Sequence, residues 1–277
     1  MSAVRLRLRN APKLRVDLRG VTPSALASLT DDEIARTKVW HGNEALALGE
    51  LFVIDRRPRA DGETALVFEG DLARFDRLGW QLDDGCIEVD GNIGHYLGAE
   101  MRAGKIRVGG RAGAFAACEM RGGALRVDGD VGDFAAASLP GSMDGMRGGT
   151  LLVGGNAGER CGDRMRRGTL LIAGRAGDFV ASRMVAGTIA VAGAIGAHPA
   201  FGMRRGTLVL ASARPILLPT FVSTNHDLRV IWRLLTASLA RISAPYGNEF
   251  ASLEERQPQR RAGDLAVEGR GEVFFFD

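Results

Sequence analysis

A repeat of 19 residues occupies the middle of this 277-residue sequence and constrains its fold more than any other feature. The segment IEVDGNIG, beginning at Ile87, recurs as IRVGGRAG at Ile106. Related segments begin, at steps of 21, 19, 19, 26, 19, 19 and 19 residues, at Leu66, Ile87, Ile106, Leu125, Leu151, Leu170, Ile189 and Leu208. A repeat of this length is typical of proteins that stack one structural unit on the next.

Two further columns keep the same phase. A methionine lies five residues before each of the last six starts, at Met101, Met120, Met146, Met165, Met184 and Met203. A glycine follows each methionine by three residues, at Gly104, Gly123, Gly149, Gly168, Gly187 and Gly206. Because a corner in the chain needs positive φ or close backbone approach, we predict positive φ in this glycine column.

The repeat predicts an all-β fold. Two apolar residues separated by one position point to the same face of a short strand, and one such unit cannot bury that face alone. We predict a right-handed parallel β-helix of about seven coils over residues 66–210, with the start residues and the methionines stacked inside. The leucine-rich-repeat signature and a six-residue acyltransferase period are both absent.

The flanks predict mixed α/β segments that cap the two ends of the stack, since open sheet edges aggregate. We divide the chain into a capping segment (1–65), the β-helix (66–210) and a C-terminal segment (211–277). The expected elements are a strand from Val4, a helix capping box at Thr30–Glu33, a strand at Leu51–Ile54, a helix over His226–Ile242, a linker over 254–263, and terminal strands. The three terminal phenylalanines are expected to pack on the N-terminal region or on a partner.

The three cysteines, Cys86, Cys118 and Cys161, are isolated in sequence. This argues against a disulfide framework and is typical of a reducing compartment, so we predict a cytoplasmic protein. No apolar run approaches membrane-spanning length, and the formal net charge is only +3. We therefore predict neither a membrane nor a nucleic-acid partner.

Motifs that carry chemistry are missing. The four histidines, at 41, 95, 198 and 226, are not paired at helical spacing, and there is no nucleophile elbow, P-loop or dinucleotide-binding fingerprint. We predict no catalytic residue and no metal ligand in this chain. The methionines are interpreted as core residues.

Two features favour contacts with a partner. Five of the six column methionines are followed by arginine, and this Arg column consists of Arg102, Arg121, Arg147, Arg166 and Arg204. Alternation turns these arginines outward, where carboxylates of the same chain, a partner or an acidic carrier tail would balance them. The 26-residue step also adds seven residues, including Ala137 to Met143, which are expected to project as a loop.

The stretch from Pro140 to Gly158, PGSMDGMRGGTLLVGGNAG, and its continuations at Met165 and Met184 resemble the glycine-rich β-helix domain of the glutamate synthase large subunit and the C subunit of formylmethanofuran dehydrogenase. The added flanks look like the C subunit. That resemblance implies a non-catalytic scaffold in the bacterial formyltransferase/hydrolase complex, which moves a formyl group from tetrahydromethanopterin to a methanofuran-like carrier and releases formate in one-carbon (formaldehyde oxidation) metabolism.

The resemblance further implies amidohydrolase-like, formyltransferase and dehydrogenase-like partner subunits, which would hold the metals and the methanofuran-type carrier. The polyglutamate tail of the bacterial carrier would suit the Arg column. Three alternatives stay open: the C subunit of formylmethanofuran dehydrogenase proper, acting in CO2 reduction; a glutamate synthase-type structural domain; and a carbohydrate-active β-helix enzyme. The last would need clustered carboxylates on one outer face, which the repeat columns do not show.

Overall fold

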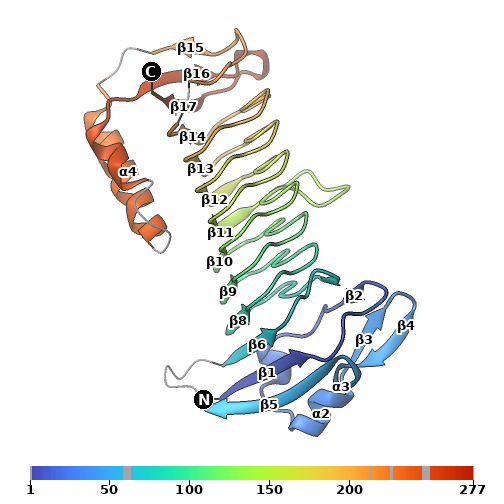
Figure 1. The fold of residues 1–277 in the computed structure, drawn as a ribbon. Helices are drawn as coiled ribbons and strands as arrows, with labels where there is room; N and C mark the ends of the chain where they lie inside the picture. The colour runs from blue at the N-terminus through green and yellow to red at the C-terminus, as the bar shows by residue number, and fades with distance from the viewer. Residues whose placement is uncertain (1, 59–63, 213, 225–226, 245–249, 277) are drawn as a thin grey trace.

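The structure, a computed structural model, describes residues 2–58, 64–212, 214–224, 227–244 and 250–276. It consists mostly of β-strands with few helices. Figure 1 shows short strands stacked one above another between an N-terminal and a C-terminal unit. The stacked strands are β6 (Ala65–Glu69), β8 (Cys86–Val89), β9 (Lys105–Val108), β10 (Ala124–Val127), β11 (Arg147–Val153), β12 (Arg167–Ile172), β13 (Thr188–Val191) and β14 (Thr207–Leu210).

Neighbouring stacked strands pair in parallel, one repeat apart. The predicted ladder is confirmed, because Leu66, Ile87, Ile106, Leu125, Leu151, Leu170, Ile189 and Leu208 pair successively. All eight are almost completely buried. A second column of parallel bridges joins Leu72, Ile93, Ala112, Val131, Ala157, Ala176 and Ile195. Each repeat therefore contacts its neighbours along two sides.

The methionine and glycine columns behave as predicted. The six column methionines have no exposed surface. The six glycines that follow them all have positive φ, between 81° and 106°. At Gly168 an added Cβ would also approach Gly149 O to 2.8 Å, so this corner excludes a side chain for two reasons.

The N-terminal unit lies at one end of the stack. Its elements are β1 (Ser2–Leu8), β2 (Val16–Asp17), α1 (Pro23–Leu26), α2 (Asp31–Arg36), β3 (Lys38–His41), β4 (Glu44–Ala47), α3 (Leu48–Leu51) and β5 (Phe52–Pro58). β1 pairs in parallel with β6 and antiparallel with β5, while β4, β3 and β2 form a second sheet with β7 (Phe75–Asp76). The predicted capping box between Thr30 and Glu33 is present at the start of α2.

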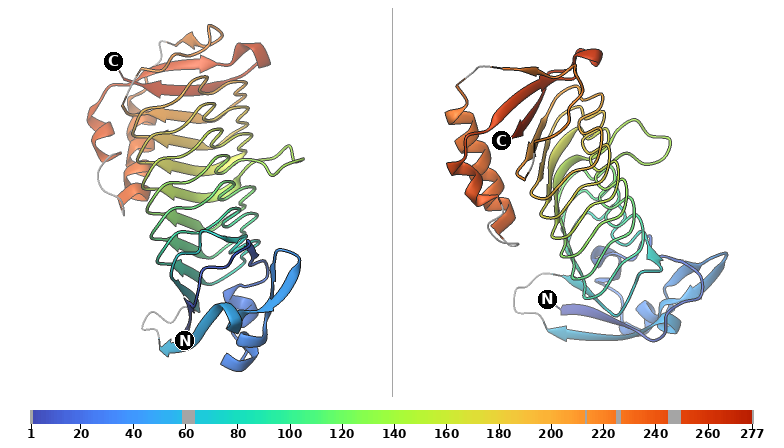
Figure 2. Two further views of the ribbon diagram at one scale, coloured as in Figure 1. Left: turned by 45° about the vertical axis from the view of Figure 1, so that its right-hand side comes forward. Right: turned by 45° about the horizontal axis from the view of Figure 1, so that its top comes forward.

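The C-terminal unit lies at the other end. It contains β15 (Val222–Ser223), α4 (Arg229–Ser243), a 3-10 turn (Ala251–Glu255), β16 (Gln259–Gly263), a second 3-10 turn (Leu265–Val267) and β17 (Gly271–Phe275). β17 pairs in parallel with β14 and so occupies the next place in the stack. Figure 2 shows α4 lying beside the upper strands.

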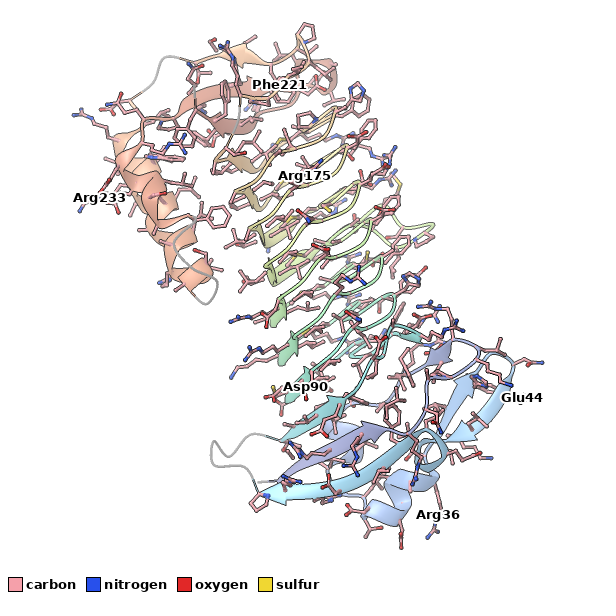
Figure 3. All side chains as sticks on the ribbon, viewed as in Figure 1. Arg36, Glu44, Asp90, Arg175, Phe221 and Arg233 are labelled. Atoms are coloured by element: carbon pink, nitrogen blue, oxygen red, sulfur yellow. The ribbon has the colours of Figure 1, made fainter. Side chains whose placement is uncertain are left out.

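α4 covers those stacked strands whose outward-facing middle residue is apolar. The outward middle residue is Glu88, Arg107 and Arg126 in β8 to β10. In β11 to β14 this residue is apolar and packs with Trp232 and Leu239 of α4: Leu152, Leu171, Ala190 and Val209. On the opposite face of α4, Arg233 points away from the stack (Figure 3).

Several sequence expectations need correction. The linker predicted over 254–263 is partly ordered structure, because β16 lies between β15 and β17 and its Arg260 pairs with Glu272. The terminal phenylalanines pack at the C-terminal end, where Phe274 meets Trp232, and not on the N-terminal region. The predicted strand from Leu51 begins at Phe52, because Leu51 ends α3. The predicted helix begins at Arg229; His226 lies outside the described residues.

Candidate binding site

The Arg column runs along the outer surface of the stack. Each of its arginines follows a buried methionine, and all five side chains are partly or largely exposed. The register is held by the backbone, since the N–H of Arg121, Arg147, Arg166 and Arg204 each donate to the carbonyl of the methionine one repeat earlier, at 2.7–2.8 Å. The arginines are therefore separated by the spacing of the strands, about 4.8 Å per repeat.

Part of the Arg column lines an open groove of about 650 Å³, here called the basic groove. The described residues that line it are Asp144, Arg147, Arg166, Arg167, Val185, Ala186, Arg204 and Arg205. Three predicted arginines thus meet there, whereas Arg102 and Arg121 lie outside it. Sequence reasoning missed Arg167 and Arg205, although each stands directly after a column arginine.

The inserted loop supplies a carboxylate to this groove. Figures 1 and 2 show the loop projecting sideways from the stack just before β11. Asp144, at the end of the loop, forms ion pairs with Arg147 at 3.0 Å and with Arg166. An oxygen of the buried Glu119 lies 3.8 Å from the same Arg147 nitrogen that pairs with Asp144. For two of the five column arginines, the chain itself therefore provides negative charge.

Both ends of the loop are tied to the stack. The Leu139 N–H donates to Glu119 Oε1 at 3.3 Å, and the Gly145 N–H donates to the Arg164 carbonyl at 2.9 Å. Arg164 also donates to the Ser142 carbonyl at 3.2 Å. These bonds fix the end of the loop that carries Asp144, so its carboxylate is positioned against the arginines.

A further column, of planar side chains, runs along the stack with one member in each repeat. Its members all have left-handed φ of 54–65°: Arg77, Tyr96, Phe115, Phe134, Arg160, Phe179 and His198. The rings of Tyr96 and Phe115 stack at 4.9 Å, those of Phe115 and Phe134 at 5.1 Å, and those of Phe179 and His198 at 5.0 Å. Such offset stacking stabilises adjacent repeats, so we interpret this column as structural.

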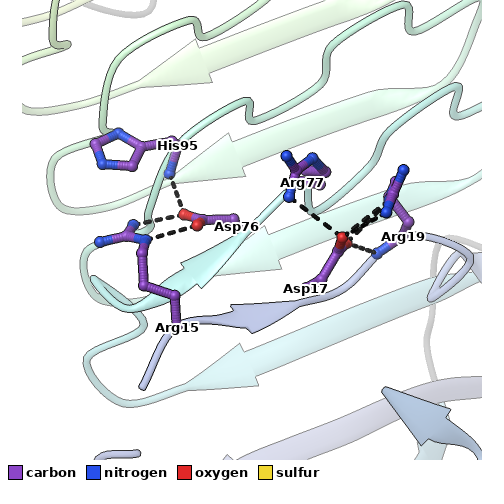
Figure 4. Close-up of polar contacts among 6 residues, drawn as sticks. All are labelled: Arg15, Asp17, Arg19, Asp76, Arg77 and His95. Atoms are coloured by element: carbon purple, nitrogen blue, oxygen red, sulfur yellow. Dashed lines mark hydrogen bonds and ion pairs between the residues drawn. The ribbon is translucent and has the colours of Figure 1, made fainter. Parts of the chain in front are cut away.

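Polar contacts join the N-terminal unit to the first repeat (Figure 4). Arg15 pairs with Asp76 at 2.5 Å, and Asp76 accepts the His95 backbone N–H at 2.7 Å. The His95 ring accepts the Ala114 N–H at its Nδ1, at 2.9 Å. Burial and the nearby Arg15 charge lower the pKa of His95, which favours the neutral ring that this bond requires. His95 thus links two repeats.

A chain with this architecture occurs in a solved protein complex. No family model matches the sequence. The crystal structure of the formyltransferase/hydrolase complex FhcABCD from Methylorubrum extorquens, in complex with methylofuran, contains a chain that aligns with a TM-score of 0.88. The alignment covers 99% of both chains at 44% sequence identity.

Curated relatives match in sequence over a shorter segment. The C subunit of the formyltransferase/hydrolase complex from Methylorubrum extorquens is 45% identical over 92 residues, 33% of each chain. The C subunit of a tungsten-containing formylmethanofuran dehydrogenase from Methanothermobacter wolfeii is 34% identical over 100 residues, 36% of this chain and 37% of the relative. The matched segments span about a third of the length of these curated relatives.

The chain belongs to the family of C subunits of formyltransferase/hydrolase and formylmethanofuran dehydrogenase complexes.

The cysteine thiols of this member of the family are buried in the core. Burial raises the pKa of the Cys161 thiol to about 12 and raises that of Cys118 as well, so both thiols stay protonated near neutral pH. Among the described residues, no group of three or more His, Cys, Asp or Glu side chains is placed to hold a metal ion. In the same part of the chain, no helix is both long and apolar enough to cross a bilayer.

Proposed function

We propose that this chain is a non-catalytic scaffold subunit of a formyltransferase/hydrolase complex. In that complex a formyl group passes from tetrahydromethanopterin to a methanofuran-like carrier and is then released as formate. The observation that carries the proposal is the alignment, at 44% identity and over 99% of its length, with a chain of FhcABCD. Amidohydrolase-like, formyltransferase and dehydrogenase-like subunits are the proposed partners.

The proposed architecture is a right-handed parallel β-helix of seven coils over residues 66–210, between a capping segment of residues 1–65 and a C-terminal segment of residues 211–277. The in-register parallel ladder and the second column of parallel bridges support it. The two end strands support the proposed boundaries, since β1 and β17 continue the sheet beyond the repeats. A stack with both ends covered is a rigid rod that presents long side surfaces, which suits a scaffold.

The surroundings of the reactive residues support a non-catalytic role. His95 accepts a backbone N–H from the next repeat, and the buried Asp163 accepts two bonds of 2.9 Å from Arg183. We propose that metals and the carrier's reactive end are held by the partner subunits. The three buried cysteines, none of which forms a disulfide within the described residues, favour a cytoplasmic location.

The Arg column is the proposed contact surface for an acidic partner or an acidic carrier tail. Guanidinium groups bind carboxylates in a forked geometry, so a groove lined by five arginines fits such a ligand. Formylmethanofuran dehydrogenase, which acts in the direction of CO2 reduction, is the second candidate assembly. The 34% identity to the C subunit from Methanothermobacter wolfeii supports it. The subunits that co-purify distinguish the two.

Reconstitution tests the proposed function. The proposed partner subunits are produced with and without this chain, and formyl transfer and formate release are measured after purified chain is added back. We expect no activity from the chain alone, loss of the intact complex without it, and recovery on addition. Full activity and normal size of a complex that lacks the chain would contradict the scaffold role.

A further inference from the structure

α4 carries apolar side chains on two opposite faces. One face packs on the stack, where Trp232 and Leu239 are buried against β11 to β14. The other face exposes Val230, Ile231 and Leu234, whose side chains are 73%, 57% and 68% exposed. Figure 3 shows that this outer side, where Arg233 points, faces away from the stack. Because a surface helix of a soluble protein normally has a polar outer face, an apolar one indicates that something covers it.

The outer side chains of α4 form one continuous stripe. Leu234 follows Val230 by four positions and Ile231 by three, and side chains at these separations are neighbours on a helix. The same spacing continues the face, here called the α4 stripe, through Ala237, Ser238 and Arg241. Among the described residues, no other helix or strand exposes three large apolar side chains. A contiguous apolar patch of this kind marks a contact site.

The two halves of the α4 stripe differ in size. The half nearer the start of the helix carries Val230 and Ile231, whereas the other half carries Ala237 and Ser238. When two such helices lie antiparallel with Leu234 at the centre, Val230 lies opposite Ser238 and Ile231 lies opposite Ala237. Large side chains then fill the space beside small ones, so the two helices can pack closely.

The two ends of the α4 stripe carry opposite charges. Asp227 lies just before the helix, and its side chain is 62% exposed although it pairs with Arg229 at 2.7 Å. Arg241 lies in the last turn, is exposed, and forms no ion pair within the residues that the structure describes. The two groups are about 20 Å apart along the helix, too far to pair within one copy.

The antiparallel arrangement brings these charges together. Asp227 of each copy lies opposite Arg241 of the other, so both ends of the contact join opposite charges. A parallel arrangement would place like charges side by side at both ends. Shape and charge thus favour the same arrangement of two identical helices.

This double match favours a second copy of the chain over other occupants. A different subunit would not require the two ends of one stripe to complement each other. A bilayer surface also fits poorly, because a helix that lies in a membrane interface has an apolar face along its whole length. The second half of the α4 stripe consists of Ala237, Ser238 and Arg241.

We propose that two copies of this chain associate through α4, with the helices antiparallel around a two-fold axis at Leu234. The same residues contribute from both copies, as in any contact around a two-fold axis. The association goes beyond the scaffold function and would join two assemblies. Since the apolar contact is small, it is reversible, with a dissociation constant on the order of 10 µM. Well below this concentration the chain is a monomer, so variants of the stripe leave its unfolding unchanged.

Analytical ultracentrifugation of the full-length chain, from about 1 to 200 µM, tests the association. We expect a monomer–dimer equilibrium. Leu234→Glu places two like charges at the axis and should weaken the dimer by at least about tenfold. The control Ile216→Glu adds the same charge at a side chain that is 93% exposed outside the stripe, and should change affinity by less than about twofold. Far-UV circular dichroism establishes that each variant is folded.

Charge reversal tests the antiparallel arrangement. Arg241→Asp and Asp227→Arg should each weaken the dimer by about threefold or more, because like charges then face each other at both ends. The double variant Asp227→Arg/Arg241→Asp restores opposite charges between the copies. Its affinity should return to within about twofold of the wild type. No such recovery is expected for a contact with another protein or with lipid, whose charges stay unchanged.

Leu234→Cys tests the position of the axis. In the proposed dimer the two introduced thiols lie opposite each other, whereas the native cysteines are buried. Mild oxidation should therefore give a disulfide-linked dimer on a denaturing gel. The control Ile216→Cys should give none at the same protein concentration.

The outcomes separate the claims. A dimer that Leu234→Glu leaves intact would place the contact elsewhere and overturn the proposal. Single charge reversals that the double variant does not rescue would overturn the antiparallel arrangement. A chain that stays monomeric throughout would also overturn the proposal. If Leu234→Glu then releases a partner subunit from the complex, or abolishes binding to phosphatidylglycerol vesicles, the stripe belongs to that occupant instead.

Discussion

Leu151 pairs directly with Leu170 of the next repeat, and both side chains are completely buried. The same relation joins every start residue to the one above it, so the interior is a ladder of like side chains. If one of these side chains were shortened, the resulting cavity would lie between repeats whose backbones are fixed by parallel pairing. The stack consequently has little freedom to collapse around a missing side chain.

Truncation of this ladder should be costly. We expect Leu170→Ala to lower the free energy of unfolding by about 2–5 kcal/mol, because burial is lost and a cavity remains. Denaturant unfolding measures the change. Leu234→Ala is the control, since Leu234 lies on the outer side of α4 and is 68% exposed; its cost should stay within about 0.5 kcal/mol. A cost below about 1 kcal/mol for Leu170→Ala would place that side chain outside the core.

The corner glycines permit a test that separates two causes. Gly168→Ala combines positive φ with contacts of 2.8 Å to Gly149 O and 2.9 Å to Met146 Cε, whereas Gly141→Ala has positive φ and no neighbour within 4 Å. We expect a cost of about 1 kcal/mol at Gly141 and clearly more, about 2 kcal/mol or above, at Gly168. Equal costs in thermal unfolding would show that close packing at the corner is unimportant.

Much of the fold follows from periodicity alone. The start, methionine and glycine columns were predictable because every repeat obeys the same alternation, and a shift of one position would turn the apolar residues outward. The planar column also has a regular place in the repeat. Five of its members stand five residues before a column methionine: Tyr96, Phe115, Arg160, Phe179 and His198. Because these residues are of four different types, the planarity that they share is not evident from the sequence.

The ends of the stack and the groove were less predictable. β17 pairs with the open edge of β14, and β16 in turn pairs with β17. These long-range backbone pairings make a strand of part of residues 254–263, although the polar composition of that segment is typical of a linker. The groove depends on the seven-residue insertion turning Asp144 back toward Arg147 and Arg166. Loop length predicts that the segment projects; the direction in which it returns depends on hydrogen bonds of Glu119 and Arg164 that sequence alone does not reveal.

His95 predicts a specific pH dependence. Because burial and Arg15 lower its pKa in the folded chain, the unfolded chain binds a proton more readily, and stability falls as pH drops below about 6.5 toward the lowered value. His95→Asn keeps an acceptor for the Ala114 N–H, as Asn92 does for Arg111 at 2.9 Å, and removes the titration. Urea unfolding at pH 7.5 and 5.5 should show a smaller loss in the variant; identical losses would exclude His95 as the cause.

The Arg column should matter for assembly more than for folding. Arg147→Gln/Arg166→Gln leaves Asp144 without its partners, but all three groups are partly exposed, so we expect a stability change below about 1 kcal/mol. Complex assembly, or the KM for an acidic carrier, should be impaired, with a clear dependence on salt. Wild-type assembly and turnover at every salt concentration would mean that these arginines are only a solvated surface.

The most direct test of the scaffold account is native mass spectrometry of the assembly purified through a tag on this chain after co-expression with the proposed partner subunits. We predict that the 29.5 kDa chain is recovered in fixed stoichiometry with formyltransferase and amidohydrolase-like subunits, and that this complex releases formate. Recovery of the chain alone, while the remaining subunits form an active complex without it, would contradict the account.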